Sequence, residues 1–270
     1  MVYIDQMMRE IRLEKPPSRI VSLVPSVTEL LFDLGLENEI CGITKFCIHP
    51  EQIYRSKKRI GGTKKVDHKI IAEINPDLIF GNKEENTKED IELLEKLYPV
   101  WMSDITTLDD AYAMIEQTGI VTGRESEAKN LNQQIKSEFT NITPAGGLNT
   151  LYLIWKNPYM AAGGDTFIND MLVRCGLNNV LANSLRYPEV DAEAIKKLAP
   201  EIILLSSEPF PFSEKHITEL QEIVPGSKIL LADGEYFSWY GSRMKGAPGY
   251  FNELIRNLNR SVRTDIKYEN

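Results

Sequence analysis

Apolar residues change their spacing abruptly near the start of the chain, in the stretch RIVSLVPSVTELLFDLGL. Residues 20–24 form a short, β-branched apolar run, which predicts a buried strand ended by a proline. Ser26 and Glu29 then have the spacing of a capping box, which predicts the start of a helix. Gly35 stands where a helix C-terminus favours a left-handed residue. The pattern therefore predicts a strand that leads directly into a helix, a junction that often lies at the ligand-binding edge of an α/β sheet.

The same succession of elements occurs twice along the chain. Residues 69–80 (KIIAEINPDLIF) and 193–204 (EAIKKLAPEIIL) each have the pattern of a short amphipathic helix, a proline, an acidic residue and a β-branched strand. Two further pairs match in the same order: LLFDLGLENEI with MLVRCGLNNVL, and IELLEKLYPVWMSD with ITELQEIVPGSKILLAD. The repeat predicts an α/β fold with two similar lobes, each with a mostly parallel sheet flanked by helices. The alternative is that βα units in general resemble one another this closely.

Helical spacing also marks the segment between the two repeats. Apolar residues recur at about this spacing over 108–115, and a second stretch over 125–139 has one apolar and one polar face. We expect an N-terminal α/β lobe over residues 1–106, a bridging helical segment over 107–142 and a C-terminal α/β lobe over 143–270. One long helix would then join the lobes, and the cleft between them would be largely formed before a ligand arrives.

Composition limits the classes of function. The 270 residues are 42% hydrophobic and 26% charged, as in ordinary globular proteins, and the net charge of −8 argues against nucleic acid or an anionic membrane surface as the main partner. The three cysteines are too few and too scattered for a disulfide framework, although a single bridge is possible. No apolar run approaches the roughly 20 residues of a membrane span. The start lacks the features of a signal peptide, so the chain as written is expected in the cytoplasm, although a chain with its leader removed would look the same.

Motifs of the common enzyme classes are absent from the sequence. No G-x-G-x-x-G follows the first strand, and there is no Walker sequence and no G-x-S-x-G elbow. The stretch GGDTF has the pattern of a tight turn into a helix capped by Asp165 or Thr166. No Ser/His/Asp or paired-carboxylate set can be assembled. We therefore expect no catalysis, with an enzyme of unrecognised chemistry as the alternative.

Five stretches together resemble one known family: PPSRIVSLVPSVTELLFDLGL, RIGGTKKVDHKIIAEINPDLIF, GGDTFINDMLVRCGLNNVL, YPEVDAEAIKKLAPEIILL and WYGSRMKGAPGYFNELI. The sequence is similar, over nearly its whole length, to the substrate-binding proteins of ABC importers for cobalamin, haem and ferric siderophores. In that type of periplasmic binding protein one long helix bridges two lobes. The opening stretch and YPEVDAEAI are most similar to cobalamin-binding members.

The resemblance implies a monomeric, non-catalytic protein that captures a metal chelate in the cleft between the lobes for uptake by an ABC transporter. It favours cobalamin or a related corrinoid, and haem or a ferric siderophore is the first alternative. A periplasmic or cell-envelope location follows from the family, whereas the missing leader favours a cytosolic carrier of metal or corrinoid.

Aromatic residues follow strand after strand, which suits a flat, mostly apolar ligand with polar groups at its rim. Each residue alone is more often an ordinary packed side chain. By the resemblance, Tyr187 and Phe46 match ligand-stacking positions of cobalamin-binding members, Tyr159 matches approximately, and Arg243 matches a recurring arginine. The expected ligand contacts are Phe46, Asn82, Lys83, Trp155, Tyr159, Tyr187, Phe210, Trp239 and Arg243. The loop with Asn82 and Lys83 has an alternative interpretation as a helix start capped by Asn86 or Thr87.

The stretch KFCIHP contains two residue types that ligate transition metals. Cys47 and His49 are two positions apart, which on an extended segment places both side chains on one side. An axial bond from either residue to cobalt or iron is therefore one hypothesis. The alternative is that Cys47 packs as a small hydrophobe and that His49 caps a loop before Pro50.

A pair of charged positions bears on docking to a transporter. In exported members of the resembled family, a glutamate on each lobe docks onto arginines of the membrane permease. Glu193 matches this position in the second lobe, but the first-lobe position falls on Lys69. A lysine would be repelled by an arginine pocket, which argues against first-lobe docking unless Asp67 or Glu73 substitutes.

Overall fold

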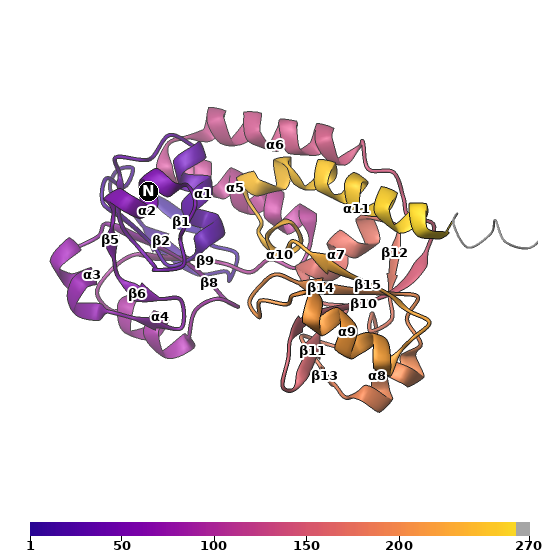
Figure 1. The fold of residues 1–270 in the computed structure, drawn as a ribbon. Helices are drawn as coiled ribbons and strands as arrows, with labels where there is room; N and C mark the ends of the chain where they lie inside the picture. Colours follow the sequence, from indigo (N-terminus) through magenta and orange to yellow (C-terminus); the bar gives the residue numbers. More distant parts are fainter. Residues whose placement is uncertain (263–270) are drawn as a thin grey trace, which may run out of the picture. The chain divides into compact units, whose positions relative to one another are not determined.

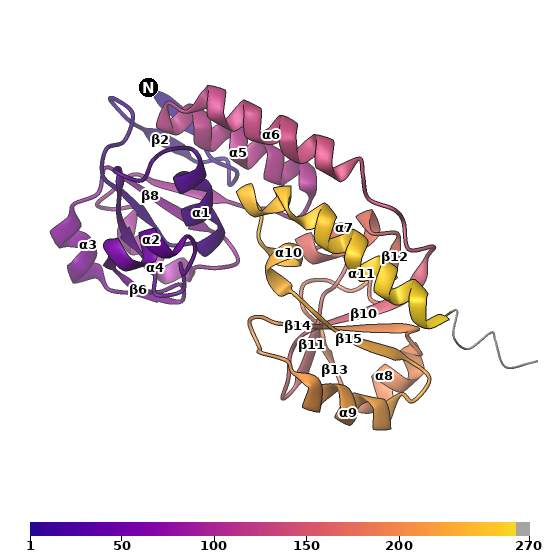
Figure 2. The same ribbon diagram turned by 45° about the horizontal axis from the view of Figure 1, so that its top comes forward.

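The structure is a computed structural model that describes residues 1–262 and divides into two units. Unit 1 contains residues 1–105, 109–135 and 240–243, and unit 2 contains residues 106–108, 136–239 and 244–262 of the described chain. Figures 1 and 2 show the elements of each unit. No helix in the described part of the chain has the length and apolar character that crossing a membrane requires.

Unit 1 is built on a five-stranded sheet in which every neighbouring pair is parallel. The strand order is β5 (Lys58–Arg59), β4 (Ile40–Ile43), β3 (Ile20–Ser22), β8 (Leu78–Asn82) and β9 (Val100–Ser103). β3 and β8 are fully buried, as continuous apolar runs in a parallel sheet predict. Because the strands are parallel, the loops after β3, β4, β8 and β9 all lie at one edge of the sheet.

The helices of unit 1 connect these strands (Figure 1). They are α1 (Pro25–Asp33), α2 (Glu51–Ser56), α3 (His68–Ile74) and α4 (Lys88–Leu94). β6 (Gly61–Gly62) and β7 (Lys65–Val66) form a short antiparallel hairpin between β5 and α3. α5 (Leu108–Thr122) and α6 (Glu125–Phe139) cover the two stretches of helical spacing, and Gly123, with φ of +71°, separates them. One of the passages of the chain from unit 1 to unit 2 lies within α6, between residues 135 and 136.

The predicted strand-to-helix junction is confirmed, but the predicted capping box is wrong. α1 begins at Pro25, which suits the first helical position because its missing N–H would have no helical partner there. Ser26 therefore lies inside the first turn, and the Glu29 carboxylate pairs with Arg243 instead of a backbone N–H. The predicted C-terminus is confirmed: Gly35 has φ of +77°, and its N–H donates to the Phe32 carbonyl (2.8 Å).

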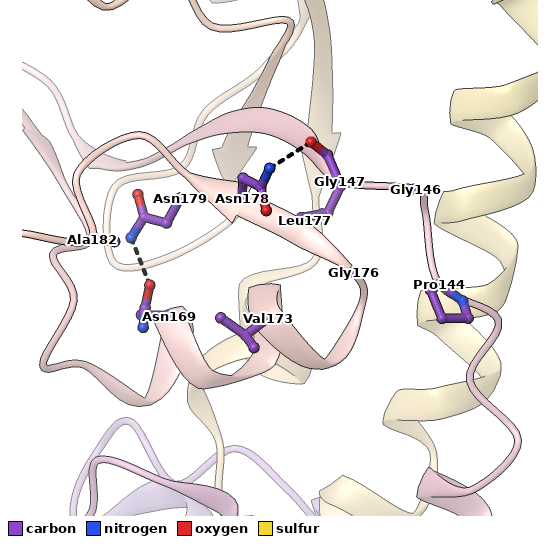
Figure 3. A pocket seen from close by; sticks show the side chains of 10 residues that line it. All are labelled: Pro144, Gly146, Gly147, Asn169, Val173, Gly176, Leu177, Asn178, Asn179 and Ala182. Atoms are coloured by element: carbon purple, nitrogen blue, oxygen red, sulfur yellow. Dashed lines mark hydrogen bonds between the residues drawn. The ribbon is translucent and has the colours of Figure 1, made fainter.

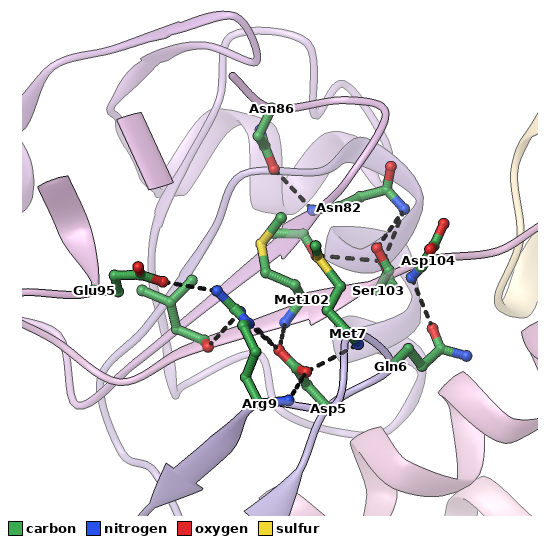
Figure 4. A network of polar contacts seen from close by, with 12 residues as sticks. Asp5, Gln6, Met7, Arg9, Asn82, Asn86, Glu95, Met102, Ser103 and Asp104 are labelled. Atoms are coloured by element: carbon green, nitrogen blue, oxygen red, sulfur yellow. Dashed lines mark hydrogen bonds and ion pairs between the residues drawn. The ribbon is translucent and has the colours of Figure 1, made fainter. Parts of the chain in front are cut away.

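β1 (Val2–Ile4) and β2 (Glu10–Arg12) form a hairpin. The turn between these two strands bonds to the outer edge of β9 (Figure 4). The Met102 N–H donates to Asp5 Oδ2 (3.1 Å), and the Gln6 N–H donates to the Met102 carbonyl (3.2 Å). Arg9 donates to the Val100 carbonyl (3.1 Å) and forms an ion pair with Asp5 (2.7 Å). The turn therefore satisfies backbone groups that an edge strand otherwise leaves open.

Unit 2 contains a mixed six-stranded sheet. The strand order is β13 (Glu189–Val190), β11 (Tyr159–Ala161), β10 (Leu148–Trp155), β14 (Ile202–Ser206) and β15 (Lys228–Ala232), and β12 (Leu177–Asn179) pairs with the start of β10. β10, β12, β14 and β15 are parallel to one another, and β11 and β13 form the antiparallel edge.

Helices cover both faces of this sheet (Figures 1 and 2). α8 (Ala192–Leu198) and α9 (Glu214–Ile223) cover one face, where Leu151, Leu153 and Ile203 enter a buried apolar cluster. α7 (Phe167–Arg174), α10 (Gly234–Ser238) and α11 (Ala247–Val262) cover the other, where Tyr152 contacts Phe237. A short 3₁₀ turn, η1 (Ser242–Lys245), precedes α11. The alternation of side chains along β10 thus serves two cores.

The predicted repeat is present as equivalent elements in the two units. α3 and α8 each have seven residues and an aspartate N-cap, Asp67 and Asp191, whose side chain accepts backbone N–H groups. Both helices end in a left-handed residue, Asn75 (φ 49°) and Ala199 (φ 42°). Each is followed by a fully buried five-residue strand, β8 or β14. The two-lobed α/β fold predicted from the sequence is therefore confirmed.

Candidate ligand-binding site

The loop after β8 is held together by Asn82, whose side chain is 1% exposed. Its Nδ2 donates to Ser103 Oγ (2.9 Å), and its Oδ1 accepts the N–H groups of Glu84 (2.8 Å) and Glu85 (3.1 Å). Lys83 is exposed and pairs with Asp104 (2.5 Å). Of the two predicted ligand contacts in this loop, Lys83 is thus the one that reaches the surface.

The residues after β4 divide between surface and core. Phe46 is 50% exposed, and Lys45 Nζ lies 5.0 Å from the centre of its ring. Cys47 is fully buried, where Thr28 Oγ1 donates to its Sγ (3.1 Å) and burial raises the pKa of its thiol. His49 is half-buried. Within residues 1–262 no three His, Cys, Asp or Glu side chains lie close enough together to hold a metal ion, so the hypothesis of metal ligation depends on these two residues alone.

Partly exposed rings follow two neighbouring strands of unit 2. Trp155, at the end of β10, is 40% exposed and meets Phe210, after β14, edge to face with ring centres 5.7 Å apart. Phe210 also packs against Phe212 (4.8 Å). Tyr159 is half-buried against the same apolar cluster, and burial raises the pKa of its phenol. The structure therefore brings Trp155, Phe210 and Tyr159 to one region of unit 2.

Trp239 lies deeper and is oriented by a carboxylate. Its ring is 8% exposed, and its Nε1 donates to Glu208 Oε1 (2.7 Å), which also accepts the Ser238 hydroxyl (2.9 Å). Glu208 lies between β14 and Phe210, so it ties the loop that carries Phe210 to the end of α10. Glu208 could not be predicted from the sequence, because nothing in its local pattern indicates a partner 31 residues away.

Tyr187 is half-buried in a segment that packs closely on a double-glycine turn. The Gly163 N–H donates to the Arg186 carbonyl (2.8 Å), and the Gly164 N–H donates to the Ser184 carbonyl (2.7 Å). A Cβ on Gly164 would lie 1.9 Å from the Ala182 carbonyl oxygen, so only glycine permits this approach. The GGDTF turn therefore serves close backbone packing and, as predicted, leads into a helix, with Thr166 as its cap.

Arg243 belongs to unit 1 through an ion pair with α1. Its guanidinium donates to both carboxylate oxygens of Glu29, at 2.9 and 2.7 Å, and the two side chains are 15% and 18% exposed. Such a two-point contact fixes the arginine in one orientation. The geometry therefore gives Arg243 a structural role beside its predicted contact with ligand.

Glu193 and Lys69 occupy the same place in the repeated element. Each is the second residue of its helix, directly after the Asp-capped start of α8 or α3. The Glu193 side chain is 81% exposed and pairs with Lys196 (2.8 Å), and Lys69 is exposed. The equivalence that the sequence repeat predicts for these two positions is thus present in the structure, with opposite charges.

Two hollows lie away from the predicted ligand contacts. One, of about 370 Å³, is in unit 2 between α7 and β12, and Figure 3 shows the asparagines that line it. Their amides bond internally: Asn179 Nδ2 donates to Asn169 Oδ1 (3.0 Å), and Asn178 Nδ2 donates to the Gly147 carbonyl (2.6 Å). The other, of about 450 Å³, lies in unit 1 beside β2 and the start of β9. Neither includes a predicted ligand contact.

Comparison with known proteins relates most of the chain to one group. A family model described as periplasmic binding protein matches residues 20–224. The uncharacterised ABC transporter substrate-binding lipoprotein YvrC of Bacillus subtilis is 27% identical over 213 residues, which cover 74% of this chain and 67% of that protein. The vitamin B12-binding protein of Photorhabdus laumondii is 25% identical over 196 residues, or 70% and 71% of the two chains.

Solved structures have the same fold. The periplasmic vitamin B12 binding protein BtuF of Vibrio cholerae superposes with a TM-score of 0.77 at 18% identity, over 91% of this chain and 99% of that one. The petrobactin-binding protein YclQ of Bacillus subtilis gives 0.81 at 17% identity, over 94% and 98%. The periplasmic heme-binding protein RhuT of Roseiflexus gives 0.75 at 19% identity, over 88% and 97%. At these identities the likeness shows the fold alone.

Proposed function

Since the chain belongs to the periplasmic binding protein family, among the substrate-binding proteins of ABC transporters, we propose that it captures a metal chelate for import and that its ligand is cobalamin or a related corrinoid. Relatives named as vitamin B12-binding proteins support the corrinoid over other chelates. The proposal includes no catalytic step, and the chelate is cargo rather than a cofactor.

The observation that carries this proposal is the set of partly exposed rings at the carboxyl ends of strands. Trp155 and Phe210 present edge-to-face rings after β10 and β14, and Phe46 presents a half-exposed ring after β4. Exposed aromatic rings of this kind suit the apolar face of a macrocycle. We propose Phe46, Lys83, Trp155, Tyr159, Tyr187 and Phe210 as direct ligand contacts, with Trp239 and Arg243 as contacts from more buried positions. Asn82, predicted as a contact, is buried and instead holds the loop that carries Lys83.

A titration of the purified protein tests the ligand. Cyanocobalamin, aquocobalamin, haem and a ferric siderophore are added separately, and the ligand absorbance is followed. We expect micromolar or tighter binding of the cobalamins, weakened about tenfold in Tyr187→Ala, because a buried ring contact contributes on the order of 1–2 kcal/mol. Tyr98→Ala, a half-buried tyrosine outside the proposed contacts, is the matched control.

The same titration distinguishes the alternatives. A spectral shift on binding aquocobalamin or haem that is lost in His49→Ala identifies an axial ligand. Binding of haem or the siderophore without cobalamin overturns the corrinoid in favour of that chelate. Binding of none of the four overturns the proposed function.

A further inference from the structure

Three residues of unit 1 form a basic and aromatic surface cluster: Lys45, Phe46 and Lys65. Lys45 and Phe46 follow the carboxyl end of β4, and the Lys45 N–H donates to the Gly61 carbonyl (2.8 Å), which fixes this segment against the β6–β7 hairpin. Lys45 Nζ lies over the Phe46 ring at 5.0 Å from its centre. The ring and one ammonium group are thus held next to each other.

Lys65 joins them on the same face of the hairpin. Gly62 and Lys65 are directly opposite in the antiparallel pair, and opposite residues direct their Cβ atoms to one face. A Cβ on Gly62 would lie 3.3 Å from Phe46 Cε2 and 3.6 Å from Lys45 Cε. The face that carries the Lys65 side chain is therefore the face on which Phe46 and Lys45 pack.

The two lysines keep their charge unneutralised. Both side chains are exposed, and within residues 1–262 neither has an ion-pair partner.

Two acidic residues near the hairpin, Asp67 and Glu85, form no ion pair with these lysines. Asp67 accepts the backbone N–H groups of Lys69 and Ile70, and burial raises the pKa of Glu85. Lys64 donates to the Glu84 carbonyl, which places a third cation at this edge. In a chain of net charge −8, two exposed ammonium groups without an ion-pair partner among the described residues, beside a half-exposed ring, indicate a place for an anion.

We propose that the Lys45–Phe46–Lys65 cluster binds a flat, apolar ligand that carries an oxyanion at its rim. The ring contacts the apolar face, and the two ammonium groups pair with the oxyanion. In the ligands of the proposed function, on which this inference rests, the oxyanion is the phosphodiester of a complete cobalamin or a carboxylate of haem. The cluster thus contributes to ligand specificity, because it distinguishes chelates whose macrocycles have similar surface areas by the charge at their rims.

Matched pairs of ligands test the cluster and distinguish the two sources of the oxyanion. Cyanocobalamin is compared with cobinamide, which has the same macrocycle without the phosphodiester, and haem is compared with its dimethyl ester. In the double variant Lys45→Gln, Lys65→Gln, the affinity for the oxyanion-bearing member should fall by about tenfold. The affinity for the member that lacks the oxyanion should fall by less than about twofold. The double variant Lys96→Gln, Lys129→Gln, which removes two exposed lysines elsewhere in unit 1, should change neither.

Two further measurements sharpen the result. Added salt should lower the affinity of the wild type for the oxyanion-bearing ligand. It should lower the affinity of the double lysine variant less. Phe46→Ala should weaken both members of a pair equally, because it removes the ring contact and leaves the charges. Circular dichroism checks that each variant is folded.

The failure of this inference differs from the failure of the proposed function. If the wild type binds a chelate but the double lysine variant weakens both members of the pair equally, or neither, the recognition of an oxyanion is wrong and the chelate function stands. If the wild type binds no chelate, both proposals are wrong.

Discussion

Polar side chains at the carboxyl ends of the strands serve mainly to hold loops in place. Asn82 ends a buried strand and Glu208 follows one, where the sequence favours ligand contacts. Each uses its side-chain atoms on its own loop or on a distant residue. The position of Asn82 could be predicted from the hydrophobic pattern. Its bond to Ser103 could not, because that partner depends on the register between β8 and β9.

The Glu85 carboxyl, in the loop after β8, should make the stability of the protein depend on pH. Burial raises its pKa above the ordinary 4.5, with Lys64 opposing the rise and Glu84 adding to it. The folded state therefore holds the proton more tightly than the unfolded state, so the contribution of Glu85 to stability is complete below about pH 4.5 and declines as pH rises through the raised pKa.

Glu85→Gln should therefore raise the free energy of unfolding at about pH 7 and change it little near pH 4, because the amide cannot ionise. Urea unfolding at the two pH values measures the difference, and Glu89→Gln, on the exposed surface of α4, is the control. An effect of equal size at both pH values would show that the ionisation of Glu85 is not the cause.

Strands and helices with a clear hydrophobic period could be predicted from the sequence, whereas the first residue of some helices could not. Thr87 and Thr166 cap α4 and α7, each being one of the two caps that the sequence left open. The capping box at Ser26 and Glu29 failed because the spacing of these two residues does not reveal that Pro25 already occupies the first turn or that Arg243 binds the glutamate. The local sequence indicates that a helix starts nearby, but contacts with distant residues determine whether a given side chain caps it.

The repeated caps allow one prediction to be tested twice. Asp67→Ala and Asp191→Ala should each lower the free energy of unfolding by about 1 kcal/mol, because each removes an acceptor for backbone N–H groups at the start of α3 or α8. Asp67→Asn and Asp191→Asn keep an acceptor in a side chain of the same size. Their free energies of unfolding should stay within a few tenths of a kcal/mol of the wild-type value. Guanidinium unfolding provides the comparison, and an asparagine loss equal to the alanine loss would contradict a role in capping.

At the scale of the whole molecule, the internal repeat was the most informative signal in the sequence, because it predicts the plan of both units at once. The return of residues 240–243 to unit 1 could not be predicted. Arg243 meets Glu29 across 214 positions of the chain, and no local pattern reports a contact of that range. Side-chain partners between distant segments are the part of the site that only coordinates supply.

The opposite charges of Lys69 and Glu193 lead to a prediction about transport. We propose that Glu193 docks onto basic residues of an ABC permease and that Lys69 does not take the equivalent role in unit 1. Glu193→Lys should lower ligand uptake through the cognate permease, reconstituted in liposomes, by about tenfold, because one attraction becomes a repulsion. Its affinity for the ligand should be unchanged.

Two comparisons make this test specific. Lys69→Glu should leave uptake unchanged or raise it, and Glu189→Lys, an exposed neighbour on β13, controls for charge alone. Uptake by Glu193→Lys at the wild-type rate would exclude Glu193 from docking.

The turn that covers β9 has a consequence for self-association. Asp5, Gln6 and Arg9 occupy the donors and acceptors that β9 would otherwise offer to a strand from another molecule. Displacing residues 1–9 would uncover a template for intermolecular pairing. We therefore expect the resistance of this protein to aggregation to depend on residues 1–9, a segment that takes no part in the proposed binding chemistry.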